Sequence, residues 1–384
     1  MRLRFMTYLL GFSALASPCI ADMPPVKTVF VIAMENYAWA LVKDSTNAPF
    51  INNVLLPQAS YCSEYYTPSN FTSSLLSYLW LEAGSTFGLT TGDTNCYSPP
   101  AIWSVAETNH LSTLLNNAGI SWKAYQECIA GDVVPLTDWW CYAVRHDPFV
   151  FFHDVTGTND PHYAYGIEHI RPYSELGPDL TNNAIARYNF ITPGLCSDMH
   201  DSCPPLYNQV LQGDSWLAAE VPRITNSIAY RDNGALFIVW DDGGSVGFPM
   251  GMILLSPLAK GNGYASTNRY THSDTLRTFQ DIFNVRPYLG GAATAGNLAE
   301  LFVSPPHDRL RFSAVEKLTA TTYRLTAAGG ATNSPLVLQS STDLVRWDPI
   351  QTNAPGDFTF DIEVPLPGQG SGDGRFFRLM GSWN

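Results

Sequence analysis

The chain alternates between two kinds of hydrophobic pattern from Val29 to about Val303. Short apolar runs rich in β-branched residues are typical of buried strands, and other segments have apolar positions at helical spacing. The strand-like runs are VFVIAM (29–34), ALFIVW (235–240) and MGMILLS (250–256), and the helix-like segments are SSLLSYLWLEAG (73–84), HLSTLLNNAG (110–119) and SDTLRTFQDIF (273–283). Strands that alternate with helices predict an α/β fold, with a mostly parallel sheet covered on both faces.

Two regions depart from this pattern. Residues 128–205 are rich in Asp, Pro, Tyr and His with little periodicity, which predicts long ordered loops of the kind that often carry functional sites. The segment VSPPHDRLRFS (303–313) is typical of a linker. Beyond it, strand-like runs separated by Gly- and Pro-rich turns predict a small all-β module similar to a β-sandwich. Those runs are TTYRLTA (321–327), PLVLQSS (335–341), FTFDIEV (358–364) and RFFRLM (375–380).

The N-terminal residues have the pattern of an export signal. Arg2 and Arg4 precede the apolar stretch 5–16, and small residues allow cleavage after Ala21 or after Ala16. An apolar stretch of this length is too short to span a bilayer. We therefore expect a signal peptide over residues 1–21, an α/β domain over 22–304, and the β module over 305–384. The mature protein is expected to be secreted or periplasmic, without stable membrane insertion.

Composition narrows the classes of partner and the redox compartment. The 384 residues include 45% hydrophobic and 14% charged residues, and the formal net charge is −13. A chain this acidic is a poor match for nucleic acid, which needs cationic patches. Six of the seven cysteines follow the signal peptide, and an even number in an exported chain suggests disulfides. Proximity along the chain favours the pairs Cys62–Cys96, Cys128–Cys141 and Cys196–Cys203, although six cysteines allow other connectivities.

Acidic and amide residues follow two of the predicted strands. Glu35 and Asn36 come directly after the run at 29–34, and Asp241 and Asp242 come after the run at 235–240. In open α/β sheets, ligands bind beyond the carboxyl ends of the strands. Three carboxylates that converge there would repel one another unless a cation lies among them. The alternative is that each acid caps a following helix or turn.

A serine pair and several histidines are further candidates. Ser73 and Ser74 lie at the start of a predicted helix, where the backbone N–H groups favour phosphate, so either is a candidate nucleophile or a plain helix cap. Three histidines have informative neighbours, although each taken alone is equally consistent with an ordinary hydrogen-bonding histidine. They are His146 in YAVRHDPF, His200 between Asp198 and Asp201, and His272 at a helix start.

Read in order, several motifs resemble the phosphoesterase family of secreted acid phosphatases and phospholipases C, a branch of the alkaline-phosphatase-like superfamily. The motifs are VFVIAMENYAW, SLLSYLWLEAGSTFG, SWKAYQE, RHDPFVFFHDV, NFITPGLCSDMHD, VWDDGG and YTHSDTLRTFQDIFNV, and the resemblance covers about residues 28–289. It implies an α/β/α sandwich with a mostly parallel central sheet. It also implies a nucleophile at Ser74, catalytic His146, His200 and His272, substrate-binding Asp198 and Asp201, and metal ligands Glu35, Asn36, Asp241 and Asp242.

The chain departs from that family at two places. It has Thr72 and Ser73 where relatives often have His-Pro, and Leu76 and Ser77 where they have Pro-Asn. The stretch SVGFPMG (245–251) has Val246 and Gly247 where many relatives have Asp-His. The missing histidine favours one metal ion over two.

The resemblance implies a hydrolase of phosphate monoesters that acts through a phosphoserine. We expect a small phosphorylated substrate and one divalent cation per chain, with Mg, Ca, Mn and Zn all compatible with the ligand types. Two alternatives remain open. One is a phosphodiesterase or phospholipase C on the same scaffold, and the other is a non-catalytic exported binding protein whose β module attaches it to a surface or polysaccharide.

Overall fold

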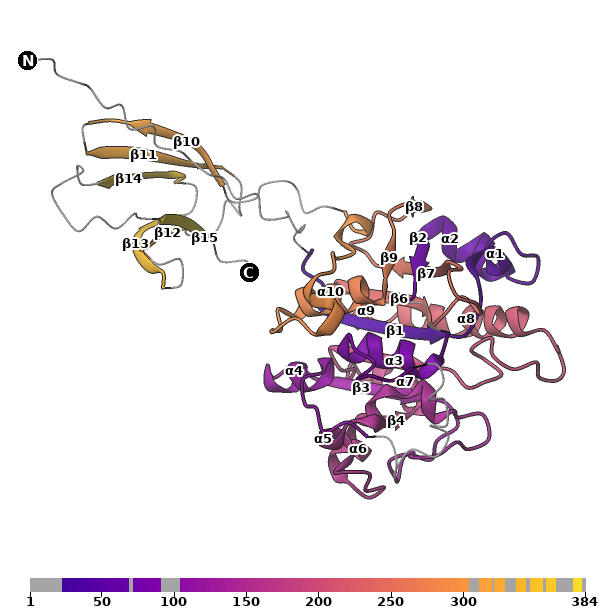
Figure 1. Cartoon of the computed structure of the whole chain (residues 1–384). Coiled ribbons are helices and arrows are strands. Elements are labelled where there is room, and N and C mark those ends of the chain that lie inside the picture. The colour runs from indigo at the N-terminus through magenta and orange to yellow at the C-terminus, as the bar shows by residue number, and fades with distance from the viewer. Residues whose placement is uncertain are drawn as a thin grey trace, which may run out of the picture. The chain divides into compact units, whose positions relative to one another are not determined.

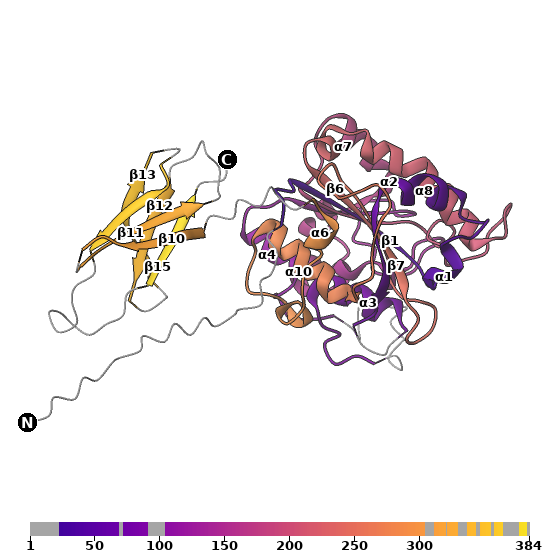
Figure 2. The same cartoon turned by 90° about the horizontal axis from the view of Figure 1, so that it is seen from above.

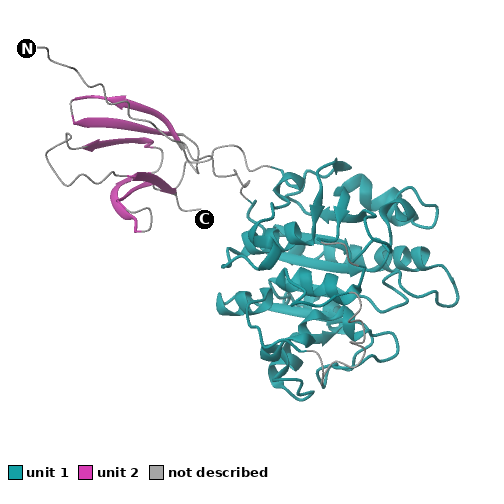
Figure 3. Ribbon diagram, in the orientation of Figure 1, with its two compact units in different colours: residues 1–303 teal, residues 304–384 magenta. Residues whose placement is uncertain are grey.

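The computed structural model describes residues 23–68, 72–90, 104–303, 311–319, 321–328, 336–342, 346–354, 357–363 and 376–381. The predicted signal peptide and Cys96 lie outside these ranges. The chain forms two compact units that divide after Val303 (Figure 3).

The first unit is built on a nine-stranded sheet in the order β4-β3-β5-β1-β6-β7-β2-β8, with β9 paired to β2. Strand β1 runs parallel to β5 on one side and to β6 on the other, and β3 runs parallel to β4 and β5. Strand β7 is antiparallel to both of its neighbours, β6 and β2. The strands are β1 (Thr28–Met34), β2 (Ser60–Tyr66), β3 (Trp122–Gln126), β4 (Ile170–Pro172), β5 (Tyr188–Thr192), β6 (Gly234–Trp240), β7 (Met250–Leu255), β8 (Tyr264–Ser266) and β9 (Tyr270–Thr271). The mostly parallel sheet confirms the predicted α/β class.

Helices cover both faces of this sheet (Figures 1 and 2). Helices α3, α4 and α10 lie on one face, and α7 and α8 lie on the other (Figure 2). The helices of the described chain are α1 (Trp39–Val42), α2 (Leu56–Gln58), α3 (Ser74–Ala83), α4 (Leu111–Asn117), α5 (His153–Thr156), α6 (Ala164–His169), α7 (Leu176–Thr181), α8 (Gln209–Thr225), α9 (Ile228–Arg231) and α10 (His272–Phe283). None of them is long and apolar enough to cross a bilayer.

The ends of α3 and α10 follow from local sequence. Helix α3 ends at Gly84, which has a φ of +65°, and a Cβ there would lie 2.7 Å from a backbone oxygen, so only glycine fits. Helix α10 begins with a capping box: Thr271 Oγ1 accepts from the Ser273 N–H, and Asp274 Oδ2 accepts from the Thr271 N–H.

The prediction of long loops over 128–205 is wrong in part. That region contains α5, α6 and α7, and it also contains β5, which pairs with β1 at the centre of the sheet. Strand β5 has only five residues, YNFIT, and all five are buried. A short strand buried on both faces shows neither alternation nor a long apolar run, so its pattern is weak.

The second unit consists of two three-stranded antiparallel sheets, β10-β11-β14 and β13-β12-β15. A shared core contains Leu325, Leu336, Leu338 and Phe360, drawn from both sheets. The strands are β10 (Arg311–Lys317), β11 (Thr322–Ala328), β12 (Leu336–Ser341), β13 (Asp348–Asn353), β14 (Thr359–Glu363) and β15 (Phe376–Gly381). Four of the six match predicted runs. Strand β10 begins inside the predicted linker, and β13 was missed because it is a mostly exposed edge strand with a polar sequence.

Candidate active site

The sheet brings the two predicted acidic pairs together at the carboxyl ends of β1 and β6. The strands are in parallel register with Met34 opposite Trp240, so the chain leaves each strand at the same level. The Asp241 N–H donates to the Met34 carbonyl oxygen at 2.9 Å, and the Asn36 N–H donates to Asp241 Oδ1 at 2.9 Å. Glu35 and Asp241 are both buried.

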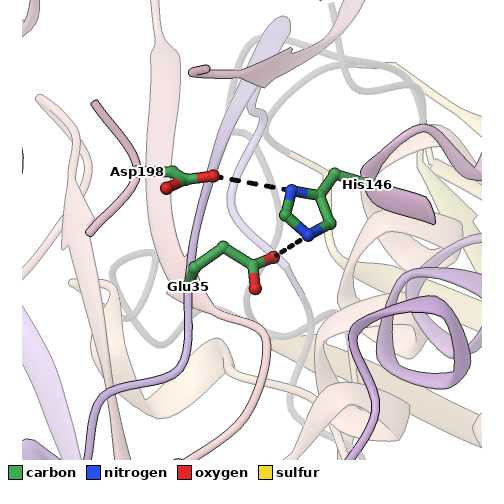
Figure 4. A group of neighbouring side chains, drawn as sticks. All are labelled: Glu35, His146 and Asp198. Carbon is green, nitrogen blue, oxygen red and sulfur yellow. Dashed lines mark ion pairs between the residues drawn. The ribbon is translucent and has the colours of Figure 1, made fainter. Parts of the chain in front are cut away.

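Two further residues join Glu35 from other parts of the chain. Asp198 follows β5, on the other side of β1, and its carbonyl oxygen accepts from the Glu35 N–H at 2.8 Å. His146 ends the 3-10 helix η2 (Val144–His146). Its imidazole faces both carboxylates, with Nε2 3.3 Å from Glu35 Oε1 and Nδ1 3.5 Å from Asp198 Oδ2 (Figure 4).

Ser74 also reaches this group. It is the first residue of α3, and its hydroxyl donates to Glu35 Oε2 at 2.9 Å. The neighbouring Ser73 occupies the N-cap position, yet its side chain makes no capping hydrogen bond. The structure thus brings Ser74 to the carboxylates and leaves Ser73 as the residue before the helix.

Four buried atoms in this group have no hydrogen-bond partner among the described residues: Glu35 Oε1, His146 Nε2, Asp198 Oδ2 and Asp241 Oδ2. Leaving a polar atom unsatisfied in a protein interior costs about 1–3 kcal/mol each, so this cluster needs another group to complete it. One ligand atom from each of Glu35, His146 and Asp198 lies within 4.8 Å of the others. Carboxylate oxygens with one imidazole nitrogen form a donor set that fits a divalent cation.

This grouping differs from the predicted ligand set of Glu35, Asn36, Asp241 and Asp242. Asn36 contacts Asp241 through its backbone N–H, and Asp242 Oδ1 accepts from the Gly244 N–H at 2.6 Å, which shapes the turn. His146, expected to be catalytic, and Asp198, expected to bind substrate, lie with Glu35 in the candidate cation cluster. The sequence gives no local signal for Asp198 as a strand-end ligand, because β5 itself was not recognised.

Burial and mutual repulsion set the protonation of the cluster. Burial raises the pKa of Glu35 well above its ordinary value, and the charge of Asp198 raises it further. The pKa of Asp198 is raised mainly by burial, and that of Asp241 by burial and then by Glu35. Burial lowers the pKa of His146, with Arg145 adding to the effect, so the ring is neutral and keeps a lone pair. A cation bound at this place would offset the free-energy cost of burying these carboxylates in their charged form.

His200 and Asp201 lie at the more open side of the cluster. The His200 N–H donates to Asp198 Oδ1 at 2.7 Å, and its ring Nδ1 lies 2.7 Å from Asp201 Oδ1. The side chain of His200 is 28% exposed. Arg145 Nη2 lies 3.4 Å from His200 Nε2, so this arginine, which sequence reasoning missed, is a cation next to the site.

His272 has a position that the resemblance did not imply. Its Nε2 lies 2.7 Å from the Asp241 carbonyl oxygen and therefore carries the proton, while Nδ1 lies 2.9 Å from the Tyr65 hydroxyl. Tyr65 also lies 2.6 Å from Thr275 Oγ1. Burial lowers the pKa of His272 to about 4. With both ring nitrogens bound to protein groups, His272 fixes the backbone of Asp241, and Tyr65 is a second residue that the sequence did not single out.

Two of the three predicted disulfides are present. Cys128–Cys141 and Cys196–Cys203 are bonded, and the second closes the loop that carries Asp198 and His200. Cys62 is buried in β2 and forms no disulfide with any described residue. Because Cys96 lies outside the described ranges, its pairing with Cys62 stays a prediction.

Comparison with known proteins agrees with the sequence resemblance. The chain is 22% identical over 313 residues to an acid phosphatase of Aspergillus fumigatus, covering 76% of this chain and 64% of that protein. It is 22% identical over 234 residues to a phosphate-repressible acid phosphatase of Penicillium chrysogenum, covering 59% and 52%. The chain therefore spans less than two thirds of the length of these relatives.

A solved protein of the alkaline phosphatase superfamily from Vibrio parahaemolyticus is 10% identical, with a TM-score of 0.47 and coverage of 88% and 87%. A model of the phosphoesterase family matches residues 43–286, more than half of the chain. On that match, this chain belongs to the phosphoesterase family.

Proposed function

We propose that the chain hydrolyses phosphate monoesters with Ser74 as its nucleophile. The observation that carries the proposal is the hydrogen bond from the Ser74 hydroxyl to Glu35 Oε2 at 2.9 Å, inside a buried cluster of carboxylates. An isolated helix-capping serine would not need a buried carboxylate partner. The acid phosphatases among its relatives support the same reaction class.

The cluster of Glu35, His146, Asp198 and Asp241 is our proposed holder of one divalent cation. Each of the four offers a buried oxygen or nitrogen atom that has no hydrogen-bond partner among the described residues. The two oxygens of Glu35 have different neighbours: Oε2 accepts a hydrogen bond from Ser74, and Oε1 faces His146. When bound, the cation would supply positive charge that offsets the negative charge of the phosphoryl group in the transition state. Mg, Ca, Mn and Zn all suit this set of ligand atoms.

In the first step, Ser74 Oγ attacks phosphorus and its proton passes to Glu35 Oε2. The bond between phosphorus and the alcohol oxygen breaks, the electron pair leaves on that oxygen, and protonated His200 supplies its proton. In the second step, a water molecule attacks the phosphoserine and gives a proton to His200. Inorganic phosphate leaves, and Ser74 Oγ recovers its proton from Glu35. His200 suits this part because its ring is partly exposed and oriented by Asp201 at 2.7 Å.

We further propose that the protein works outside the cytoplasm on small phosphorylated substrates. Two disulfides in the described chain are typical of an oxidising compartment. The net charge of −13 argues against nucleic acid as a partner. Attachment to a surface or polysaccharide is our proposal for the second unit.

The test is a phosphate-release assay on the full chain across pH, with each of the four metals added after chelation. We expect activity that chelation abolishes, and a loss of at least roughly a thousandfold in kcat for Ser74→Ala. Ser73→Ala is the matched control, since its side chain makes no capping hydrogen bond, and it should retain most activity. Equal loss in the two variants contradicts the assignment of Ser74.

The same assay decides between the alternatives. If a choline phospholipid is hydrolysed faster than phosphate monoesters, the result favours the hypothesis of a phosphodiesterase or phospholipase C. The absence of any turnover with all four metals favours a non-catalytic binding protein.

A further inference from the structure

Two adjacent tryptophans are unusually exposed for their size. Trp139 is 72% exposed, and Trp140 is 86% exposed. Tryptophan has a large apolar face, so leaving two of them in water is unfavourable unless they bind something. The pair therefore needs a functional explanation more than a scattered surface leucine does.

The local backbone makes the exposure more notable. Trp139 and Tyr142 exchange two backbone hydrogen bonds, of 3.1 and 2.8 Å, and so close a tight turn with Trp140 and Cys141 at its tip. Trp140 has a φ of 49°, in the left-handed region that favours glycine or asparagine. Turn stability by itself therefore does not explain a tryptophan at this position.

The turn is fixed to the chain segments that build the active site. The disulfide Cys128–Cys141 connects it to the segment after β3. The Leu195 N–H donates to the Cys141 carbonyl oxygen at 2.9 Å, and a Cβ on Gly194 would lie only 2.6 Å from Cys141 Sγ. Leu195 and Gly194 precede Asp198 by a few residues, so the turn is packed against the base of the loop that carries Asp198.

A second connection runs through charged groups. Asp138 Oδ1 accepts from the Val144 N–H at 2.8 Å, and Asp138 Oδ2 lies 3.9 Å from Arg145 Nη1. Arg145 lies 3.4 Å from His200 and is followed directly by His146. The tryptophan turn is thus linked to His200, on the more open side of the cluster, through Asp138 and Arg145.

Two other loops at the same edge of the sheet also display apolar side chains. Strands β3, β5 and β6 share their direction with β1, so the segments that follow them leave from one edge. Exposed large side chains occur in all three of these segments: Trp139 and Trp140 after β3, Leu206 and Tyr207 after β5, and Val246 and Phe248 after β6. The edge of the sheet that carries the buried, charged cluster is therefore also the edge from which these three loops with exposed apolar side chains begin.

We propose that Trp139 and Trp140 form a platform that binds a flat aromatic ring in the alcohol part of the substrate. The inference rests on the proposed function, in which the phosphoryl group meets Ser74 and the alcohol points toward His200. The face of an indole stacks on other aromatic rings largely independently of the substituents on those rings, because every aromatic ring has a π-face. Aryl phosphates and nucleoside monophosphates share this chemistry.

The test compares substrates that differ by the ring. Phenyl phosphate is paired with glycerol 1-phosphate, and adenosine 5′-monophosphate with ribose 5-phosphate. For the double variant Trp139→Ala/Trp140→Ala, we expect kcat/KM to fall roughly threefold to tenfold on the ring-bearing members and to stay unchanged on the others. If kcat/KM of the double variant falls on phenyl phosphate alone, the substrate is assigned as an aryl phosphate. If it falls on adenosine 5′-monophosphate alone, the substrate is assigned as a nucleotide.

Ile228→Ala is the matched control. Ile228 is 56% exposed, but it lies in α9, before β6 begins, and so belongs to the opposite edge of the sheet. It should leave all four substrates unaffected. Equal loss on all four substrates in the double variant, or no loss on any, overturns the platform.

A binding measurement separates this proposal from the proposed reaction. Calorimetric titration of Ser74→Ala protein with adenosine 5′-monophosphate and with ribose 5-phosphate needs no turnover. A ring preference that disappears in the Trp139→Ala/Trp140→Ala background supports the platform even if no ester is hydrolysed. Binding of phosphatidylcholine vesicles that depends on both tryptophans, without any ring preference, would instead assign the turn to a lipid surface and overturn the proposal.

Discussion

The ring of Tyr78 lies parallel to the imidazole of His146, with ring centroids 5.3 Å apart and an interplanar angle of 6°. Both residues are buried. Tyr78 lies one helical turn after Ser74 in α3, so one helix positions the proposed nucleophile and the ring that stacks on His146. The Tyr78 hydroxyl lies beside Glu35, although no described residue meets it with full hydrogen-bond geometry. The aromatic face is the part of Tyr78 that stacks on the imidazole, and we expect it to orient that ring.

Replacing this ring should impair catalysis more than removing its hydroxyl. We expect Tyr78→Leu to lower kcat/KM by roughly tenfold or more, because a tilted imidazole no longer meets Glu35 and Asp198. Tyr78→Phe keeps the stacked face and removes an unsatisfied polar atom, so its activity and melting temperature should stay close to the parent values. If Tyr78→Phe lowers kcat/KM as much as Tyr78→Leu does, the hydroxyl next to Glu35 is the part of Tyr78 that catalysis needs.

A divalent cation should stabilise the protein by relieving repulsion among its buried carboxylates. Binding of the cation at a hundred times its Kd would add about 2.7 kcal/mol to the free energy of unfolding, seen as a rise in melting temperature. Asp198→Asn should abolish most of that rise. Asp201→Asn is the control, because the side chain of Asp201 is 48% exposed and pairs with His200. A rise that survives Asp198→Asn would show that the cation binds elsewhere.

Removal of the Tyr65 hydroxyl should weaken the support behind Asp241. In Tyr65→Phe, His272 Nδ1 loses its partner at 2.9 Å in a fully buried place. Urea unfolding should show a free energy of unfolding lower by about 1–3 kcal/mol. Thr275→Val removes the other partner of Tyr65, at 2.6 Å, and should have a smaller effect because His272 keeps its donor. If Tyr65→Phe and Thr275→Val lower the free energy of unfolding equally, the hydrogen bond to His272 is not the more important one.

His110, which takes no part in the proposed reaction, should make stability depend on pH. Burial lowers its pKa, but hydrogen bonds to Asp154 and Glu82 outweigh burial and raise the pKa to about 9. Its Nδ1 lies 2.8 Å from Glu82 Oε1 and its Nε2 lies 3.0 Å from Asp154 Oδ1. Ser112 and Thr113 complete its polar neighbours, and Phe152 stacks on the ring.

Because the folded-state pKa lies above that of the unfolded chain, the stabilisation is complete below about pH 6.5 and is lost as pH rises through 9. The loss should reach up to about 3 kcal/mol. Unfolding of the parent and of His110→Gln at pH 6 and pH 9.5 measures it, and the variant should lack most of the difference. His162→Gln, at an exposed histidine, should behave like the parent. A His110→Gln variant with the full pH dependence would assign the effect to other groups.

The sequence by itself determined the elements whose signals are local. Continuous apolar runs predicted β1, β6 and β7, and helical spacing with a glycine stop predicted α3 to within a residue of its observed start. Since parallel strands end at one edge of a sheet, the run-and-acid pattern also predicted that Glu35 and Asp241 would meet, as they do. The two confirmed disulfides were predictable because each joins cysteines fewer than fifteen residues apart.

Only the tertiary structure decided which of the expected site residues contact Glu35. Asp198 reaches it because β5, unrecognised in the sequence, pairs with β1, and His146 reaches it from a segment with no periodic pattern. His272, which opens a helix, is buried and contacts the Asp241 carbonyl oxygen. Each of these contacts joins residues separated by dozens to hundreds of positions, and they depend on strand order and loop path. Hydrophobic periodicity reports which face of an element is buried, but carries no information about which element lies next to it.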